Sequence, residues 1–138
     1  MIVRNCAGGV VFCGDKVFLL KNEKGEWVLP KGVMHNGDLP NEVALKRVKE
    51  EAGIAAEIVS TVGRTNYEFF SVTRQRPVCN KIVWYIMKSP NEKFKIGEDK
   101  FIDGGFFNLE KALDITTYSQ DKSLLNLSFQ KFKELQVS

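Results

Sequence analysis

Hydrophobic side chains recur at the spacing of an α-helix between residues 40 and 54. They fall along one stripe, formed by Ala44, Leu45, Val48 and Ala52. Residues 41–52 contain no glycine or proline, Pro40 suits the first helical turn, and Gly53 suits the residue that closes a helix. The pattern therefore predicts an amphipathic helix over residues 41–52, with Asp38 as its N-cap.

The remaining apolar stretches predict strands, because β-branched and aromatic residues lie between turn residues. Three strands are expected before the helix, at residues 6–13, 16–20 and 27–29. After the helix we expect paired extended segments at 55–63 and 64–70, then strands at 78–87 and 104–107. A short helical turn at 109–113 and a final helix from Ser119 or Asp121 to about Leu135 complete the chain. This order of helices and strands predicts an α+β sandwich with a mixed sheet.

The polar face of the predicted helix carries candidate metal ligands. Arg47, Glu50 and Glu51 stand at positions i, i+3 and i+4, so they share a face away from the apolar stripe. Neighbouring carboxylates suit Mg²⁺ or Mn²⁺, which prefer oxygen ligands and can hold a phosphate chain. The glycine loop before the helix, with Gly32 and Gly37, suits the same chemistry.

Composition limits the classes of function that remain. The chain has 138 residues, of which 43% are hydrophobic, so we expect one domain over residues 1–138. A net charge of +3 is compatible with a small polyanion but too low for duplex nucleic acid, and no basic face with interleaved aromatics favours RNA. Three cysteines fit no zinc or disulfide framework and favour a cytoplasmic protein. The sequence shows neither a signal peptide nor a membrane span.

The segment from Gly32 to Ile54 resembles the Nudix box. That motif is a glycine, five residues, a glutamate, seven residues, and then Arg-Glu-aliphatic-any-Glu-Glu-any-Gly-aliphatic. Six positions match at the proper spacing: Gly32, Val48, Glu50, Glu51, Gly53 and Ile54. Residues 27–32 also resemble the approach to the box. The resemblance implies a Nudix-type α/β/α sandwich with a mixed sheet, in which the loop and helix form a metal site.

Three positions depart from the Nudix pattern. Asp38 stands for the first glutamate and Lys46 for the arginine, and both changes are conservative. Arg47, however, replaces a glutamate that often binds metal or acts as the base in the family. The resemblance implies that Glu50 and Glu51, with the carbonyl of Gly32, are the ligands of Mg²⁺ or Mn²⁺.

Arg47 leaves two interpretations open. In the first, which we rank higher, the guanidinium forms an ion pair with one of the two neighbouring carboxylates. In the second, it contacts a phosphate of the substrate. If the chain is catalytic, the general base comes from Glu50 or Glu51, or from an acid outside the box. The candidates outside the box precede the last predicted strand and are Glu98, Asp99 and Asp103.

Candidate substrate contacts lie on both sides of the box. Lys31 adjoins Gly32, so it is placed to meet a phosphate, and Tyr67 or Tyr118 could stack on a base. Four further cations follow the box, where a polyphosphate could run: Arg64, Arg74, Arg76 and Lys81. The general layout resembles the diadenosine polyphosphate hydrolase branch of the family. Members of the family are often dimers, so the resemblance also allows a homodimer.

Two functions from different classes follow. The first is metal-dependent hydrolysis of a phosphoanhydride in a nucleoside diphosphate linked to another group, such as a dinucleoside polyphosphate. The second is a catalytically weakened Nudix module that binds a nucleotide as a sensor or partner-binding domain. Arg47 is the residue that separates the two hypotheses.

Overall fold

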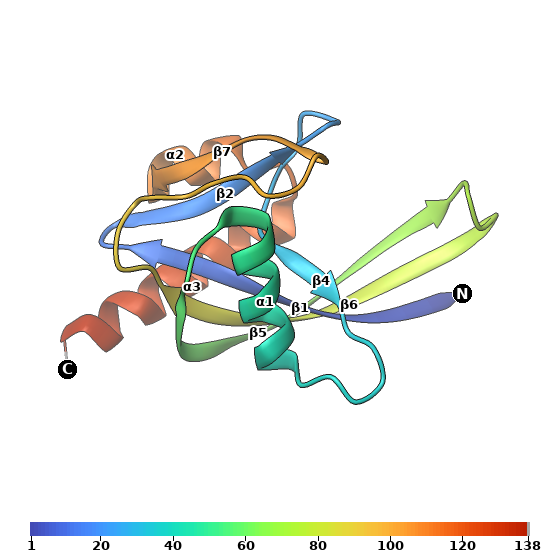
Figure 1. Cartoon of the computed structure of the whole chain (residues 1–138), viewed down its shortest axis with the longest axis horizontal. Helices are drawn as coiled ribbons and strands as arrows, with labels where there is room; N and C mark the ends of the chain where they lie inside the picture. The colour runs from blue at the N-terminus through green and yellow to red at the C-terminus, as the bar shows by residue number, and fades with distance from the viewer. Residues whose placement is uncertain (138) are drawn as a thin grey trace.

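A computed structural model, which describes residues 1–137, shows a curled mixed sheet between helices (Figure 1). The seven strands are β1 (Ile2–Cys13), β2 (Lys16–Asn22), β3 (Trp27–Val28), β4 (Lys31–Val33), β5 (Glu57–Ser71), β6 (Arg76–Lys88) and β7 (Phe101–Asn108). The three helices are α1 (Pro40–Ala52), α2 (Leu109–Ile115) and α3 (Ser119–Val137). The predicted α/β/α sandwich is confirmed.

The sheet has the strand order β3-β2-β1-β6-β5, with β4 added beside β1 and β7 beside β2. Strands β1 and β6 run parallel over their whole contact, from Ile2 opposite Val78 to Phe12 opposite Lys88. All other pairs are antiparallel. The sheet is therefore mixed, as the sequence predicts.

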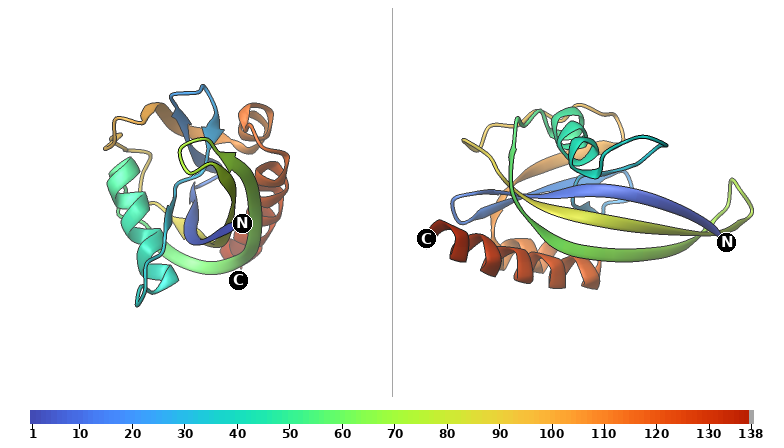
Figure 2. Two further views of the ribbon diagram at one scale, coloured as in Figure 1. Left: turned by 90° about the vertical axis from the view of Figure 1, so that its right-hand side faces the viewer. Right: turned by 90° about the horizontal axis from the view of Figure 1, so that it is seen from below.

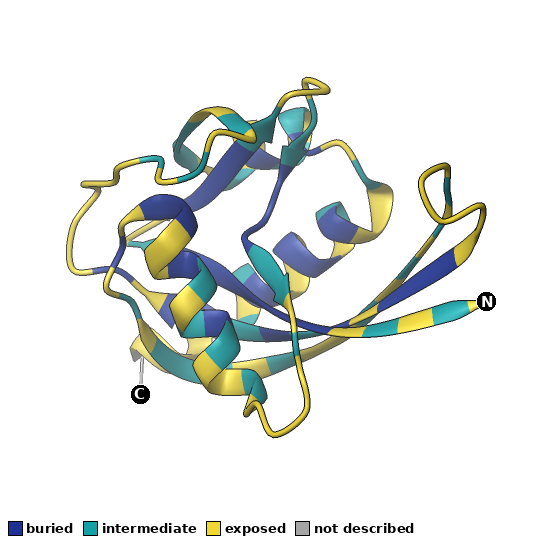
Figure 3. Ribbon diagram, turned by 45° about the vertical axis from the view of Figure 1, so that its right-hand side comes forward, coloured by how far each residue is buried: buried dark blue, intermediate teal, exposed yellow. Residues whose placement is uncertain are grey.

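Two hydrophobic cores lie on opposite faces of this sheet. Alternate residues of β1 enter different cores, so Val10 packs toward α2 and α3 while Val11 packs toward α1. The same alternation separates Leu19 from Leu20 on β2. Figure 2 shows α1 on one face of the sheet and α3 on the other, and Figure 3 shows that α1 buries only its inner side. Because both faces are covered, β1 is buried at every position from Cys6 to Phe12.

Helix α1 begins and ends much as its sequence predicts. Pro40 is its first residue, and Gly53 closes it in the left-handed conformation at φ 65°, donating its N–H to the carbonyl of Lys49. The predicted N-cap is wrong. Leu39 takes that place without a side-chain bond, because the Asp38 carboxylate accepts the backbone N–H of His35 in the preceding turn.

Two other expectations are corrected. The segments predicted at 55–63 and 64–70 do not pair with each other, because residues 57–71 form the single long strand β5, which pairs with β6. Lys31 and Gly32 lie in the short strand β4, opposite β1, and not in a free loop. No helix within residues 1–137 combines the length and apolar character that a membrane crossing requires.

Gly8 generates a prediction about packing. A methyl group at this position would lie 2.5 Å from the Trp84 ring and 2.7 Å from the carbonyl oxygen of Pro30. Trp84 is fully buried and the carbonyl belongs to the backbone, so neither can move freely. We expect Gly8→Ala to lower the free energy of unfolding by about 1 to 3 kcal/mol, measured by urea denaturation.

Gly105→Ala is the matched control for this measurement. A methyl group there would approach only the Phe107 side chain, at 3.3 Å. Its effect should be the smaller of the two, and equal losses in both variants would contradict the packing argument.

Candidate active site

A pocket of about 600 Å³ opens between the end of helix α1 and the start of helix α3. Its lining includes side chains from β4, β5, β6 and the loops before β3 and β7. The lining includes the cations Arg47, Lys31 and Lys100 and the aromatic side chains of Tyr67 and Tyr118. The pocket therefore joins the Nudix-like helix to segments far away in the sequence.

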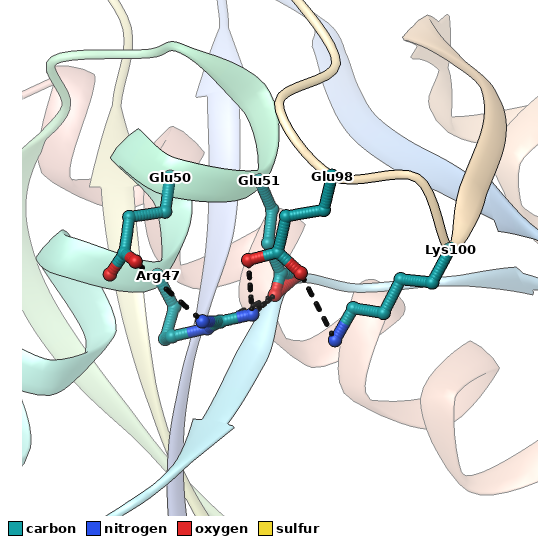
Figure 4. Close-up of polar contacts among 5 residues, drawn as sticks. All are labelled: Arg47, Glu50, Glu51, Glu98 and Lys100. Carbon is teal, nitrogen blue, oxygen red and sulfur yellow. Dashed lines mark hydrogen bonds and ion pairs between the residues drawn. The ribbon is translucent and has the colours of Figure 1, made fainter.

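Arg47, which lines this pocket, lies among three carboxylates (Figure 4). Its Nη2 donates to Oε2 of Glu51 at 2.7 Å and lies 2.8 Å from Oε1 of Glu98, while its Nε donates to Glu51 at 3.2 Å. Nη1 approaches Oε2 of Glu50 only to 3.9 Å. Lys100 extends the cluster by lying 3.4 Å from the other oxygen of Glu98. The ion pair predicted for Arg47 is therefore present, and it involves Glu51 most closely.

Two glycines allow this cluster to form. A methyl group at Gly32 would collide with the side chain of Arg47, so the arginine lies directly against the backbone of β4. A methyl group at Gly97 would collide with the carbonyl oxygen of Glu50. The N–H of Gly97 donates to the carbonyl of Glu51 at 3.1 Å, which fixes the loop that carries Glu98 against the end of α1.

Burial governs the charge of the pair. Glu51 has only 1% of its side chain exposed, and this burial raises the pKa of its carboxyl although the bond and charge of Arg47 act in the opposite direction. For Arg47, burial acts to lower the pKa, but the hydrogen bond and charge of Glu51 outweigh it and leave the pKa raised. Arg47 therefore stays a cation, and its charge favours the ionised form of Glu51 against the effect of burial.

The expected metal site is not formed by these side chains. Three carboxylates converge, which is the right chemistry for Mg²⁺, but the cation at their centre is the guanidinium of Arg47. Within residues 1–137, no three Asp, Glu, His or Cys side chains are grouped closely enough to hold a metal ion. The residues do not fit a metal ion while Arg47 keeps this position.

The other predicted site residues fall into two groups. Lys31, Gly32 and Tyr67 line the pocket. Arg64 and Lys81 are exposed outside its lining, because their strand neighbours Thr65 and Ile82 point into it and successive side chains alternate in direction. Among the loop acids, only Glu98 reaches the cluster, whereas Asp99 and Asp103 are exposed.

Sequence reasoning missed several charged residues of the pocket, among them Glu26, Lys100 and Asp121. Of these, only Asp121 is named by the sequence analysis, as a possible start of the last helix. Each of them reaches the pocket from a segment distant in sequence from the Nudix-like box. Only tertiary contacts bring these residues to the pocket, so no local signal identifies them.

Comparison with known proteins identifies the family. Residues 2–127 match the family described as NUDIX domain. The chain belongs to the Nudix family. Members of this family act on substrates that contain a pyrophosphate linkage, and they generally use divalent metal ions.

Individual relatives of this Nudix domain are distant. An RNA pyrophosphohydrolase of Erythrobacter litoralis is 28% identical over 71 residues, which are 46% of this chain and 42% of that protein. The chain spans less than half the length of the curated relatives that it matches.

Solved structures share the fold. An Ap4A hydrolase of C. elegans in a binary complex is 22% identical with a TM-score of 0.72, covering 95% of this chain and 98% of that one. The NUDIX domain of Shewanella oneidensis NrtR complexed with ADP ribose is 14% identical with a TM-score of 0.77, covering 96% and 90%. At these identities the likeness shows the Nudix fold alone.

The pair between Arg47 and Glu51 generates a prediction about stability. In Arg47→Met the buried carboxyl of Glu51 loses the partner that lowers its pKa, so it resists ionisation further. We expect a loss of about 3 to 5 kcal/mol in the free energy of unfolding at neutral pH. The folded state holds the Glu51 proton more tightly than the unfolded chain does, so stability falls as the pH rises above the ordinary glutamate value of 4.5. Urea denaturation at pH 5 and pH 7.5 measures this dependence.

The control is the double variant Arg47→Met with Glu51→Gln, which removes both charges. It should recover most of the loss at pH 7.5. A loss in Arg47→Met that is the same at both pH values would show that the arginine contributes through packing and not through the charge of Glu51.

Proposed function

We propose that this Nudix domain binds a nucleoside diphosphate joined to a further group and hydrolyses its phosphoanhydride only slowly. A dinucleoside polyphosphate is one molecule of this class. The observation that carries the proposal is the guanidinium of Arg47, which lies at the pocket wall bonded to Glu51 and Glu98. Arg47 supplies a fixed positive charge for binding and keeps the carboxylates from other cations.

The three cations that line the pocket support phosphate binding. Among the described residues, Nη1 of Arg47 has only the distant contact with Glu50, beyond hydrogen-bond length, so its N–H groups can meet a phosphate oxygen. Lys31 and Lys100 line the same pocket and add two further positive charges. Their side chains provide the donors that a diphosphate requires.

Low turnover follows from the same contacts. Glu50 and Glu51 are the carboxylates expected to serve hydrolysis, yet Glu51 is buried and bonded twice to Arg47. Releasing it would leave a charged carboxylate without a partner, which is costly in a buried site. Hydrolysis therefore competes with an interaction that holds the folded protein together.

A binding module without turnover is the second candidate. It is favoured by the arrangement of Glu51, whose carboxylate is engaged by Arg47 and not by any other described cation within ion-pair distance. The two candidates predict the same pocket and the same ligand class, so only an activity measurement separates them. The cytoplasmic location and the homodimer stay predictions from the sequence.

A substrate panel tests the proposal. The purified protein is incubated with dinucleoside polyphosphates, nucleotide sugars, ADP-ribose and nucleoside triphosphates, each with Mg²⁺ and with Mn²⁺, and products are separated by ion-exchange chromatography. We expect slow, metal-dependent cleavage of at least one compound. Binding of these compounds without any cleavage would select the second candidate, and neither binding nor cleavage would refute both.

Arg47→Glu tests the role of the arginine. The variant restores the glutamate of the Nudix pattern and places it beside Glu50, Glu51 and Glu98. Metal affinity and turnover should rise, with affinity increasing about tenfold to a hundredfold. Isothermal titration with Mn²⁺ and the panel above measure the two changes.

Arg64→Glu is the matched control, because it makes the same change of charge outside the pocket lining. It should alter neither quantity. If Arg47→Glu also leaves metal affinity and turnover unchanged, Arg47 is not what limits the reaction.

A further inference from the structure

Three acids line the pocket, and they differ in their partners. Glu51 is bonded to Arg47. Glu26 has both oxygens engaged, because Oε2 accepts the hydroxyl of Tyr118 at 2.5 Å and Oε1 accepts the amide of Asn22 at 2.9 Å. Asp121 accepts no hydrogen bond on its side chain from any residue that the structure describes, and it forms no ion pair there.

Asp121 is nevertheless buried, with only 8% of its surface exposed. Its burial raises the pKa of the carboxyl, which reflects the cost of a charge without a bonded partner. Lys31 is the cation that acts on it through space, but the two do not come within ion-pair distance in residues 1–137. The carboxyl therefore presents unused acceptor oxygens to the pocket.

Its place in helix α3 does not account for this burial. Asp121 lies in the first turn, where an acid interacts favourably with the helix dipole, and its backbone N–H donates to the carbonyl of Tyr118. An exposed acid would gain the same interaction without losing its hydration. The helix turn explains why an acid is tolerated there, but not why the side chain lines a pocket.

Aromatic side chains line the same pocket. The Tyr67 ring stacks on Phe69, with centroids 5.5 Å apart at 28°, and meets Tyr118 edge-on at 5.0 Å. The hydroxyl of Tyr67 donates to that of Tyr118, which donates in turn to Glu26, so both tyrosines are held in place. A flat ring with N–H donors at its edge matches an aromatic wall and an unpaired carboxylate.

We propose that Asp121 determines specificity by accepting a hydrogen bond from the ring amino group of a nucleobase bound in this pocket. The inference rests on the proposed function, because it assigns the base end of the ligand whose phosphates meet Arg47, Lys31 and Lys100. It selects adenine, guanine or cytosine nucleotides over those with an oxygen or a hydrogen in place of the amino group. Tyr67 and Tyr118 contact the face of the base, and Asp121 accepts a hydrogen bond from the amino group at its edge.

Binding of nucleotide pairs tests this assignment. Affinities of the full chain are measured by isothermal titration for ADP against IDP, CDP against UDP, and GDP against IDP, in EDTA and again with Ca²⁺. In at least one pair the amino-bearing nucleotide should bind about tenfold more tightly than its partner. Asp121→Asn, which adds a donor in place of an acceptor oxygen, should abolish or reverse that preference.

Asp114→Asn is the matched control, because it makes the same substitution at an exposed acid outside this pocket. It should leave every ratio unchanged. Because the readout is a ratio between two ligands, a mere loss of stability in Asp121→Asn does not imitate the expected result. If that variant fails to fold, the ratios of the unmodified chain decide by themselves.

The outcomes separate the two proposals. Equal affinities within all three pairs, or a preference that Asp121→Asn leaves intact, would overturn the role of Asp121 while the proposed function stands. Failure of every nucleotide to bind would overturn both.

Discussion

The site depends on a carboxylate that is buried and needs a positive partner. Glu51 lies against the core at the end of helix α1, where water cannot stabilise its charge. Arg47 stands one helical turn earlier on the same helix and supplies that partner. Gly32 leaves room for the arginine, and Gly97 lets the Glu98 loop reach the helix. Three segments that are separate in sequence, strand β4, helix α1 and the loop of residues 97–100, thus meet around one guanidinium.

Much of the fold can be predicted from the sequence because the residues that determine each helix and strand lie within it. The apolar stripe, Pro40 and Gly53 define helix α1 almost to the residue, and the strands flank it in the expected order. One error arises where a distant contact decides. Residues 57–71 form one strand because β6 offers a partner of similar length, and nothing within the segment itself signals this. The other error is local: the Asp38 carboxylate accepts the N–H of His35 in the turn instead of capping the helix, and spacing does not decide between these two contacts.

The candidate site likewise has features that the sequence predicts and features that only tertiary contacts determine. Helical spacing predicts that Arg47 lies beside Glu50 and Glu51, and it does. Spacing does not reveal that Glu51 is buried, because a polar face can be covered by a loop such as residues 95–98. Arg64 and Lys81, which the sequence suggests as substrate contacts, lie outside the pocket lining. Which side chains of a strand face inward follows from its place in the sheet and not from local spacing. Asp121 reaches the pocket through the position of α3, which no motif encodes.

Replacing a metal ion by an arginine shifts where binding energy must come from. A divalent ion brings two charges and coordinates phosphate oxygens directly, whereas a guanidinium brings one charge and already shares its donors with Glu51 and Glu98. In this cluster three carboxylates share two cations, Arg47 and Lys100, so part of the positive charge that a polyphosphate would meet is already neutralised. A ligand that stays bound under these conditions draws more of its affinity from the rest of the pocket. Under the proposed function, the unpaired Asp121 beside the aromatic side chains is where ligands are distinguished, and selectivity depends on the base more than on the phosphate chain.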